Sequence, residues 1–239
     1  MKGGFNVLSH RFVHLIQYLP KGMVVFISKN IAGRYINKYA NIELTGKENL
    51  QSIQKPIIFI CNHLSNSDGL ILNKVLKKQD LTFVAGVKLT NDPVTNLGMN
   101  IVKTIRIKPN SADKDALTKV IKTIKEGNNV IIFPEGTRSR TGNMIEGKKG
   151  VLLIAKITKA IIIPIGLSGT EKLLPINEKG NMSSENFNYA EVKVNIGKPV
   201  HLVEKDPEED RHLYDDRALK DLMRNIALLL PEEQRGVYK

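Results

Sequence analysis

One short apolar run that ends in a cluster of polar residues constrains the fold of this chain most. Pro56 to Cys61 is a bounded run of mostly β-branched or aromatic residues, typical of a buried strand in a parallel sheet. A turn-forming polar cluster follows it, and Ser67 or Asp68 is placed to cap the next helix. His63 is therefore predicted to lie just past the carboxyl end of a strand, where open α/β sheets bind ligands.

The spacing of His63 and Asp68 suggests a catalytic pair. Residues five apart on one helix do not face each other, but across a strand–turn–helix corner they can. An aspartate bonded to one ring nitrogen of a histidine fixes the tautomer and leaves the other nitrogen as a general base. The alternative is a polar loop with an incidental histidine, and the spacing alone favours that alternative.

A second corner of the same layout begins about seventy residues later, at Asn129. A buried-type strand again runs into polar residues, where Pro134 ends the strand and Gly136 permits a tight turn. Arg138 is the type of residue that binds a phosphate through two parallel hydrogen bonds. Glu135 would repel such a phosphate, so we expect it to orient Arg138 or to accept a hydrogen bond from a substrate hydroxyl.

Strands that alternate with helices predict an α/β fold: a mixed, largely parallel sheet covered by helices. Strands are expected at 42–44, 56–61, 81–87, 101–107, 130–133, 161–165 and 192–196. Helices are expected at 68–78, 94–99, 111–127, 148–158 and 208–230. Ser111 is expected to cap the third of these helices, and the alternating run 192–196 is expected to be edge-like.

Composition narrows the possible partners. The 239 residues predict one α/β domain, 41–239, with an appendage at 1–40 rather than two equal domains. A net charge of +12 favours phosphate-bearing partners: nucleic acid, anionic lipid headgroups or phosphorylated metabolites. Cys61 is the only cysteine, which excludes an internal disulfide and fits a reducing compartment. The apolar runs are far shorter than the ~18–20 residues of a transmembrane helix.

The segment 1–40 predicts two short amphipathic helices with basic residues interspersed. The first runs from Phe12 to Leu19, residues 20–22 interrupt it, and the second begins at Met23. Such a pattern is typical of a segment that lies in a membrane interface. A helical hairpin packed on the protein's own core explains it equally well.

Together, NHLSNSD at 62–68 and FPEGTRSR at 133–140 resemble the glycerolipid acyltransferases, specifically the 1-acyl-sn-glycerol-3-phosphate (lysophosphatidate) acyltransferases. The resemblance covers roughly 40–205. Ile163-Pro164-Ile165 matches the family's proline-containing fourth block, and Lys149-Gly150 a basic pair that follows the third. Gly147 departs from the family, which often has an aromatic residue there.

The resemblance implies transfer of a fatty acyl group to the free hydroxyl of lysophosphatidate, giving phosphatidate in phospholipid synthesis. It implies acyl-CoA or acyl carrier protein as donor, no cofactor, His63 as base and Asp68 as its orienting partner. We expect backbone N–H groups near the corner to stabilise the oxyanion. The substrate-binding residues implied are Arg106, Lys108, Glu135, Gly136, Thr137 and Arg138.

The family's acceptor-phosphate arginine follows a glycine and apolar residues, and here Gly98 precedes both Arg106 and Lys108. The sequence leaves open which of them takes that role. In a strand both point to one face, so both could meet one phosphate.

Two alternatives remain open at this point. One is a related acyltransferase that uses glycerol phosphate or a lyso-phospholipid as acceptor. The other, which the charge alone suggests, is a nucleic-acid-binding protein, although aromatic residues are 5% and no recognition module is visible. We expect a peripheral protein on the cytoplasmic face of a membrane. No metal site is expected, because the remaining histidines lack ligand-like spacing with carboxylates: His10, His14, His201 and His212.

Cys61 permits a different mechanism, because it precedes His63 by two positions and a Cys–His nucleophile pair is conceivable. Side chains two apart on a strand project in parallel and do not converge. A thiol that ends a buried apolar run usually behaves as a small hydrophobe with a raised pKa. We therefore expect direct transfer without an acyl-enzyme.

Overall fold

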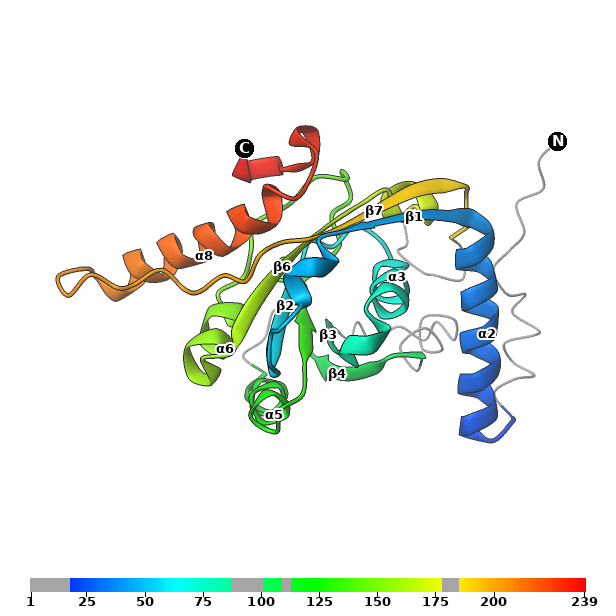
Figure 1. The fold of residues 1–239 in the computed structure, drawn as a ribbon, viewed down its shortest axis with the longest axis horizontal. Coiled ribbons are helices and arrows are strands. Elements are labelled where there is room, and N and C mark those ends of the chain that lie inside the picture. The colour runs from blue at the N-terminus through cyan, green and yellow to red at the C-terminus, as the bar shows by residue number, and fades with distance from the viewer. Residues whose placement is uncertain (1–17, 87–100, 109–112, 178–184) are drawn as a thin grey trace.

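A computed structural model describes residues 18–86, 101–108, 113–177 and 185–239. Within these residues the chain forms a seven-stranded sheet of order β1-β7-β6-β2-β5-β3-β4 (Figure 1). The strands are β1 Ala40–Thr45, β2 Ile57–Cys61, β3 Thr82–Gly86, β4 Lys103–Ile107, β5 Val130–Ile132, β6 Ile161–Ser168 and β7 Ala190–Ile196. Among these seven described strands, β6 and β7 pair antiparallel and every other neighbouring pair is parallel. The predicted mixed, largely parallel sheet is confirmed.

Helices cover the sheet on both faces, as βαβ connections require. The α-helices are α2 Lys21–Tyr39, α3 Asp68–Val75, α5 Lys114–Lys125, α6 Gly150–Thr158, α7 Thr170–Leu173 and α8 Arg211–Ala227. The short 3-10 helices are η1 Lys47–Leu50, η2 Lys77–Gln79, η4 Glu232–Gln234 and η5 Gly236–Tyr238. Helices α2 and α3 lie on one side of the sheet, and α5, α6 and α8 lie on the other (Figure 1).

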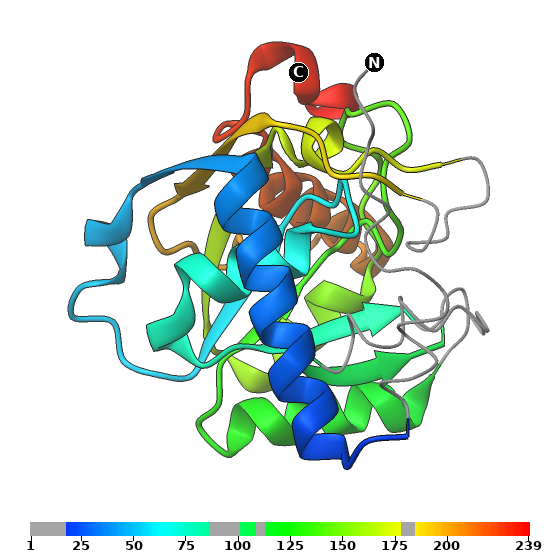
Figure 2. The same ribbon diagram turned by 90° about the vertical axis from the view of Figure 1, so that its right-hand side faces the viewer.

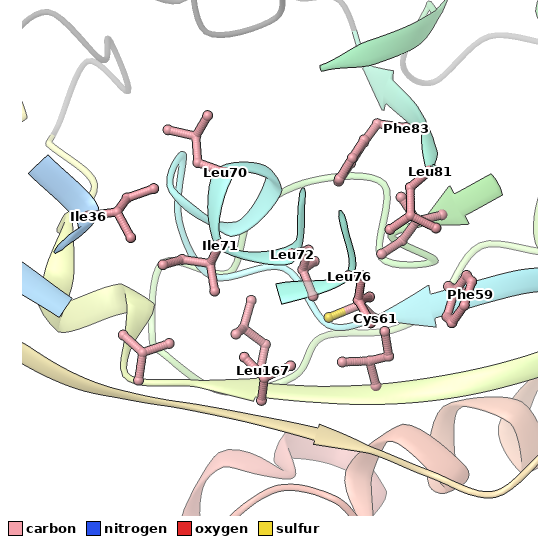
Figure 3. Packing of buried hydrophobic residues seen from close by; sticks show 14 of the residues in the cluster. Ile36, Phe59, Cys61, Leu70, Ile71, Leu72, Leu76, Leu81, Phe83 and Leu167 are labelled. Atoms are coloured by element: carbon pink, nitrogen blue, oxygen red, sulfur yellow. The ribbon is translucent and has the colours of Figure 1, made fainter. Parts of the chain in front are cut away.

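The core therefore has two layers that share the central strands. On the α3 side, Ile71 packs with Phe59 of β2 and Ile36 of α2 in one buried cluster (Figure 3). On the opposite side, Ile58 and Ile60 of β2 pack with residues of α5, α6 and α8. Because β2 is buried on both faces, it reads as a continuous apolar run, as the sequence analysis required.

The expected edge-like position of 192–196 is wrong. Strand β7 lies inside the sheet, between β1 and β6, and β1 is the edge strand. The residues of β7 alternate because Val192 and Val194 face the core while Glu191 and Lys193 on the other face are exposed. Alternation of apolar and polar residues indicates that one face of a strand is open to solvent. An interior strand shows the same alternation where one face of the sheet is not covered.

Helix boundaries follow local capping chemistry. The N-cap of α5 is Asp113, whose carboxylate accepts a hydrogen bond from the Ala116 N–H at 3.0 Å. The sequence analysis expected Ser111 as this cap, which is wrong because the helix begins at Lys114 with Asp113 directly before it. The expected helix at 94–99 lies outside the described residues. Helix α5 ends at Lys125, and Gly127 adopts a positive φ of 83°, as its place after the helix predicts.

The described part of the N-terminal segment forms one long helix. Helix α2 begins at Lys21, two residues before the predicted start at Met23, and most of the first predicted helix lies outside the described residues. Val24 and Ile36 of α2 are buried against the core, whereas Met23 and Phe26 are exposed. Within the described ranges, no helix combines the length and apolar character needed to cross a bilayer.

Candidate active site

His63 and Asp68 form a hydrogen-bonded pair where β2 meets α3. The His63 Nδ1 atom lies 2.7 Å from Asp68 Oδ2. The same oxygen accepts hydrogen bonds from the backbone N–H groups of Leu64 at 2.7 Å and Ser65 at 2.9 Å. The Asp68 side chain is fully buried, so its position is fixed. With Asp68 as acceptor, Nδ1 carries the proton and the lone pair of Nε2 is left to take one.

The His63 ring is also held from a second side. It stacks on Phe133, the residue after β5, with ring centroids 4.1 Å apart and planes 19° apart. The His63 side chain nevertheless stays 23% exposed, in contrast to Asp68. The imidazole is therefore fixed in orientation and still reachable by a substrate.

The two polar corners lie side by side because β2 and β5 are parallel neighbours, with Ile60 paired to Ile132. Their backbones are directly joined, since the Ser139 N–H donates to the His63 carbonyl oxygen at 2.8 Å. On the other side of β2, the Asn62 side chain bonds both the N–H and the C=O of Leu167, each at 2.8 Å. The residue before the histidine is thereby fixed to β6.

Glu135 joins the corners through the main chain. Its side chain is fully buried, and Oε1 accepts from the His63 N–H at 3.0 Å while Oε2 accepts from the Ile145 N–H at 3.2 Å. Burial raises the pKa of Glu135 to about 8, against the lowering effect of the two N–H donors. The sequence analysis expected this carboxylate to orient Arg138 or to meet a substrate hydroxyl. The structure shows it bound to backbone amides, and its contact with substrate stays a prediction.

Arg138 is largely buried beside a carboxylate that the sequence analysis missed. Its Nη1 lies 3.4 Å from Glu185 Oε1, and the two side chains are 16% and 0% exposed. The other Glu185 oxygen accepts from the Asn66 side chain at 2.7 Å. Burial raises the pKa of Glu185, opposed by its bonds with Asn66 and Arg138. Glu185 thus connects both motifs from the loop before β7, where no local pattern could have predicted it.

The remaining predicted acceptor residues lie at different distances from His63. Gly136 and Thr137 are exposed at the tip of the second corner, and Gly136 has the positive φ, 70°, that a tight turn needs. Arg106 and Lys108 are exposed at the far edge strand, β4. Three strand spacings separate β4 from β2, roughly 14 Å in total. The choice between Arg106 and Lys108 stays open.

The face of β4 can be read from the strand register. Ile60 is level with Ile105 through the successive pairs across β5 and β3. Ile105 packs on the side of α5, so Arg106 projects to the opposite side of the sheet. Phe133, against which His63 stacks, packs on that same opposite side.

Three amides near the histidine are already in use. The N–H groups of His63, Leu64 and Ser65 donate to Glu135 and Asp68. These three amides therefore do not supply the oxyanion contacts that the sequence analysis expected near this corner. Within the described residues, no three His, Cys, Asp or Glu side chains are grouped as a metal site.

Residues near the C-terminus pack against the loop around Gly147. The Gly147 N–H donates to the Tyr238 hydroxyl at 2.9 Å. A Cβ at Gly147 would lie 2.8 Å from the Met223 sulfur of α8, so the space that a side chain needs there is already filled.

Cys61 faces the core and not the histidine. Its side chain is fully buried among Leu72, Leu76 and Leu167 (Figure 3). Burial, together with the nearby charges of Asp68 and Glu135, raises the pKa of the thiol well above its usual value. A thiol of this kind is a poor nucleophile.

The chain is similar to known acyltransferases. The model of the acyltransferase family matches residues 41–168. A chloroplastic 1-acyl-sn-glycerol-3-phosphate acyltransferase of Arabidopsis thaliana is 31% identical over 198 residues, covering 82% of this chain and 53% of the relative. A chloroplastic enzyme of the same name from Brassica napus is also 31% identical, covering 82% and 55%. The chain thus spans about half the length of these curated relatives.

A solved structure has a similar fold. The crystal structure of the 1-acyl-sn-glycerophosphate (LPA) acyltransferase from Thermotoga maritima aligns with a TM-score of 0.56 and 25% identity. The alignment covers 90% of this chain and 88% of the Thermotoga chain. The family match includes both corners and more than half of the sequence. This chain therefore belongs to the acyltransferase family.

Proposed function

We propose that the protein acylates the free hydroxyl of lysophosphatidate to give phosphatidate, a step of phospholipid synthesis. The observation that carries the proposal is the His63–Asp68 pair, held beside the corner that bears Arg138. The names of the curated relatives and of the Thermotoga protein support this acceptor. The donor is an acyl thioester, either acyl-CoA or acyl carrier protein.

The chemistry follows from Nε2 of the partly exposed His63 side chain. This nitrogen takes the hydroxyl proton as the acceptor oxygen attacks the thioester carbonyl carbon. Asp68 stabilises the positive charge that then develops on the imidazole. When the tetrahedral intermediate collapses, the C–S bond breaks and the imidazolium returns its proton to the departing sulfur. The acyl group passes directly between substrates, and no protein nucleophile is acylated.

The acceptor phosphate is bound by basic side chains at the same edge of the sheet. Arg138 offers a planar guanidinium, and Arg106 or Lys108 adds charge from β4. Gly136 and Thr137 shape the tip of the pocket.

An assay with purified protein tests the proposal. Lysophosphatidate is mixed with acyl-CoA or with acyl carrier protein charged with the same acyl chain, and phosphatidate is measured. Glycerol 3-phosphate and a lyso-phospholipid replace lysophosphatidate in parallel reactions. Phosphatidate formation that His63→Ala abolishes supports the proposal. Faster turnover of another acceptor would assign the protein to a related reaction instead.

Helix α2 would dock the protein peripherally on an anionic membrane surface, on the cytoplasmic face. Its exposed Met23 and Phe26 supply apolar contacts, and its exposed Lys29 and Arg34 supply positive charge. Deleting the whole segment 1–40 would uncover core residues of the sheet, since α2 buries part of its own surface there. The sharper variant is therefore Met23→Ser with Phe26→Ser.

Flotation with anionic vesicles should show weaker binding of this double variant, while short-chain soluble substrates are still turned over. Leu213→Ser with Leu228→Ser, at two exposed leucines in and directly after α8, is the matched control. Equal loss of vesicle binding in both double variants would contradict a specific role for α2.

A further inference from the structure

The C-terminal residues 231–238, here called the C-terminal strap, lie against the loop that follows the second corner. Figure 2 shows this segment in red at the end of the molecule where the green loop after β5 also lies. The Met144 N–H donates to the Gln234 carbonyl oxygen at 2.8 Å, and the Gly147 N–H donates to the Tyr238 hydroxyl at 2.9 Å. The strap thus bonds the loop at two points, three residues apart.

The contact is too close to be a loose surface association. Gly236 has a φ of 56°, and a Cβ built on it would lie 1.9 Å from the Met144 carbonyl oxygen. Only glycine fits a backbone approach of this kind. The Gln234 side chain also donates to Glu171 at 3.2 Å, which ties the strap to α7. The C-terminal strap is therefore held against the loop at Gln234 and again at Tyr238.

The loop is also hydrogen-bonded to the corner that carries the histidine. The N–H of Ile145, between the two strap contacts, donates to Oε2 of Glu135, whose Oε1 accepts from the His63 N–H. Next to it, the Lys148 N–H donates to the Pro134 carbonyl oxygen at 2.8 Å. The loop is thus joined by hydrogen bonds to Glu135 and to Pro134. Glu135 in turn accepts from the backbone N–H of His63, the residue that carries the imidazole.

We propose that Tyr238 is a positioning residue, which acts through the 144–147 loop and Glu135 to hold His63 in its reactive orientation. The inference rests on the proposed function for its kinetic test, although its spectroscopic test does not. Small displacements of a general base cost rate because proton transfer requires hydrogen-bond distance in the transition state. Tyr238 bonds Gly147 through its hydroxyl and packs against the core cluster on the α8 side, so we expect substrate affinities to change little.

The primary test compares Tyr238→Phe with Tyr189→Phe, a control at an exposed tyrosine directly before β7. Tyr238→Phe removes only the hydroxyl that accepts the hydrogen bond from the Gly147 N–H. We expect kcat to fall roughly three- to tenfold, with both KM values within about twofold and the control unchanged. An unchanged kcat, or KM values that rise instead of a fall in kcat, would overturn the proposal.

A double-mutant cycle with Glu135→Gln separates positioning from general loosening. If Tyr238 acts through Glu135, the two effects on kcat are not additive, because each breaks the same connection. Fully additive effects would refute it. Truncation after Arg235 provides a second variant, and it should lower kcat at least as much as Tyr238→Phe at a temperature where both proteins are folded.

A measurement without turnover distinguishes failure of this inference from failure of the proposed function. In protein labelled with ¹⁵N-histidine, the ring signals of His63 are identified by their loss in His63→Ala. Tyr238→Phe should shift these signals, and Tyr189→Phe should not. Unshifted signals would refute the positioning role whatever the substrate. Inactivity of the wild-type protein with lysophosphatidate would refute the proposed function alone.

Discussion

The buried Glu135 carboxyl should make the folding stability of this protein depend on pH, and Glu135→Gln should remove that dependence. In the unfolded chain the group has an ordinary pKa of 4.5, whereas burial raises it to about 8 in the folded protein. Between these values the folded protein retains a proton that the unfolded chain releases. The free energy of unfolding therefore falls as pH rises, and this contribution is complete below pH 4.5 and lost above pH 8.

The magnitude follows from the two pKa values. Their difference corresponds to about 5 kcal/mol in total, at about 1.4 kcal/mol for each pH unit in the window. Gln has the same shape without an ionisable proton, so only the wild-type protein should show this slope. The wild-type advantage over Glu135→Gln should then shrink by about 4 kcal/mol between pH 5 and pH 9.

Urea unfolding of both proteins at pH 5, 6, 7, 8 and 9 measures this difference directly. Glu191→Gln, at an exposed position of β7, controls for the loss of one surface carboxylate. A wild-type advantage that stays constant across this range would show that Glu135 does not titrate inside it, and would refute the argument from burial.

Three further substitutions test the site. Asp68→Asn should lower turnover about 10²–10⁴-fold with normal circular dichroism, since His63 loses its anionic partner; near wild-type turnover would contradict the pair. Glu185→Gln should raise the apparent KM for lysophosphatidate several-fold and leave the donor KM unchanged, because Arg138 loses its buried partner; a change in the donor KM alone would misplace the phosphate site. Cys61→Ala should retain most activity, and mass spectrometry after mixing with donor should find no acyl adduct on Cys61 in the wild-type protein.

What the sequence determined by itself is local. The apolar run 56–61 and the polar residues after it predicted β2 and its corner. Both predictions were possible because the burial of a strand and the type of a turn depend on residues that are neighbours in the sequence. The pairing of His63 with Asp68 spans five residues, so a single corner specifies it. The capped amphipathic pattern likewise located α5, although its cap is Asp113.

Only the tertiary structure decided which distant residues meet. Glu185 reaches Arg138 across 47 residues, Glu135 reaches the His63 backbone across 72, and Tyr238 reaches Gly147 across 91. None of these contacts has a local pattern, because each depends on strand order and on how the loops cross the end of the sheet. The interior place of β7 was hidden for the same reason: its alternation records solvent on one face, while its neighbours are set by the packing of the whole chain.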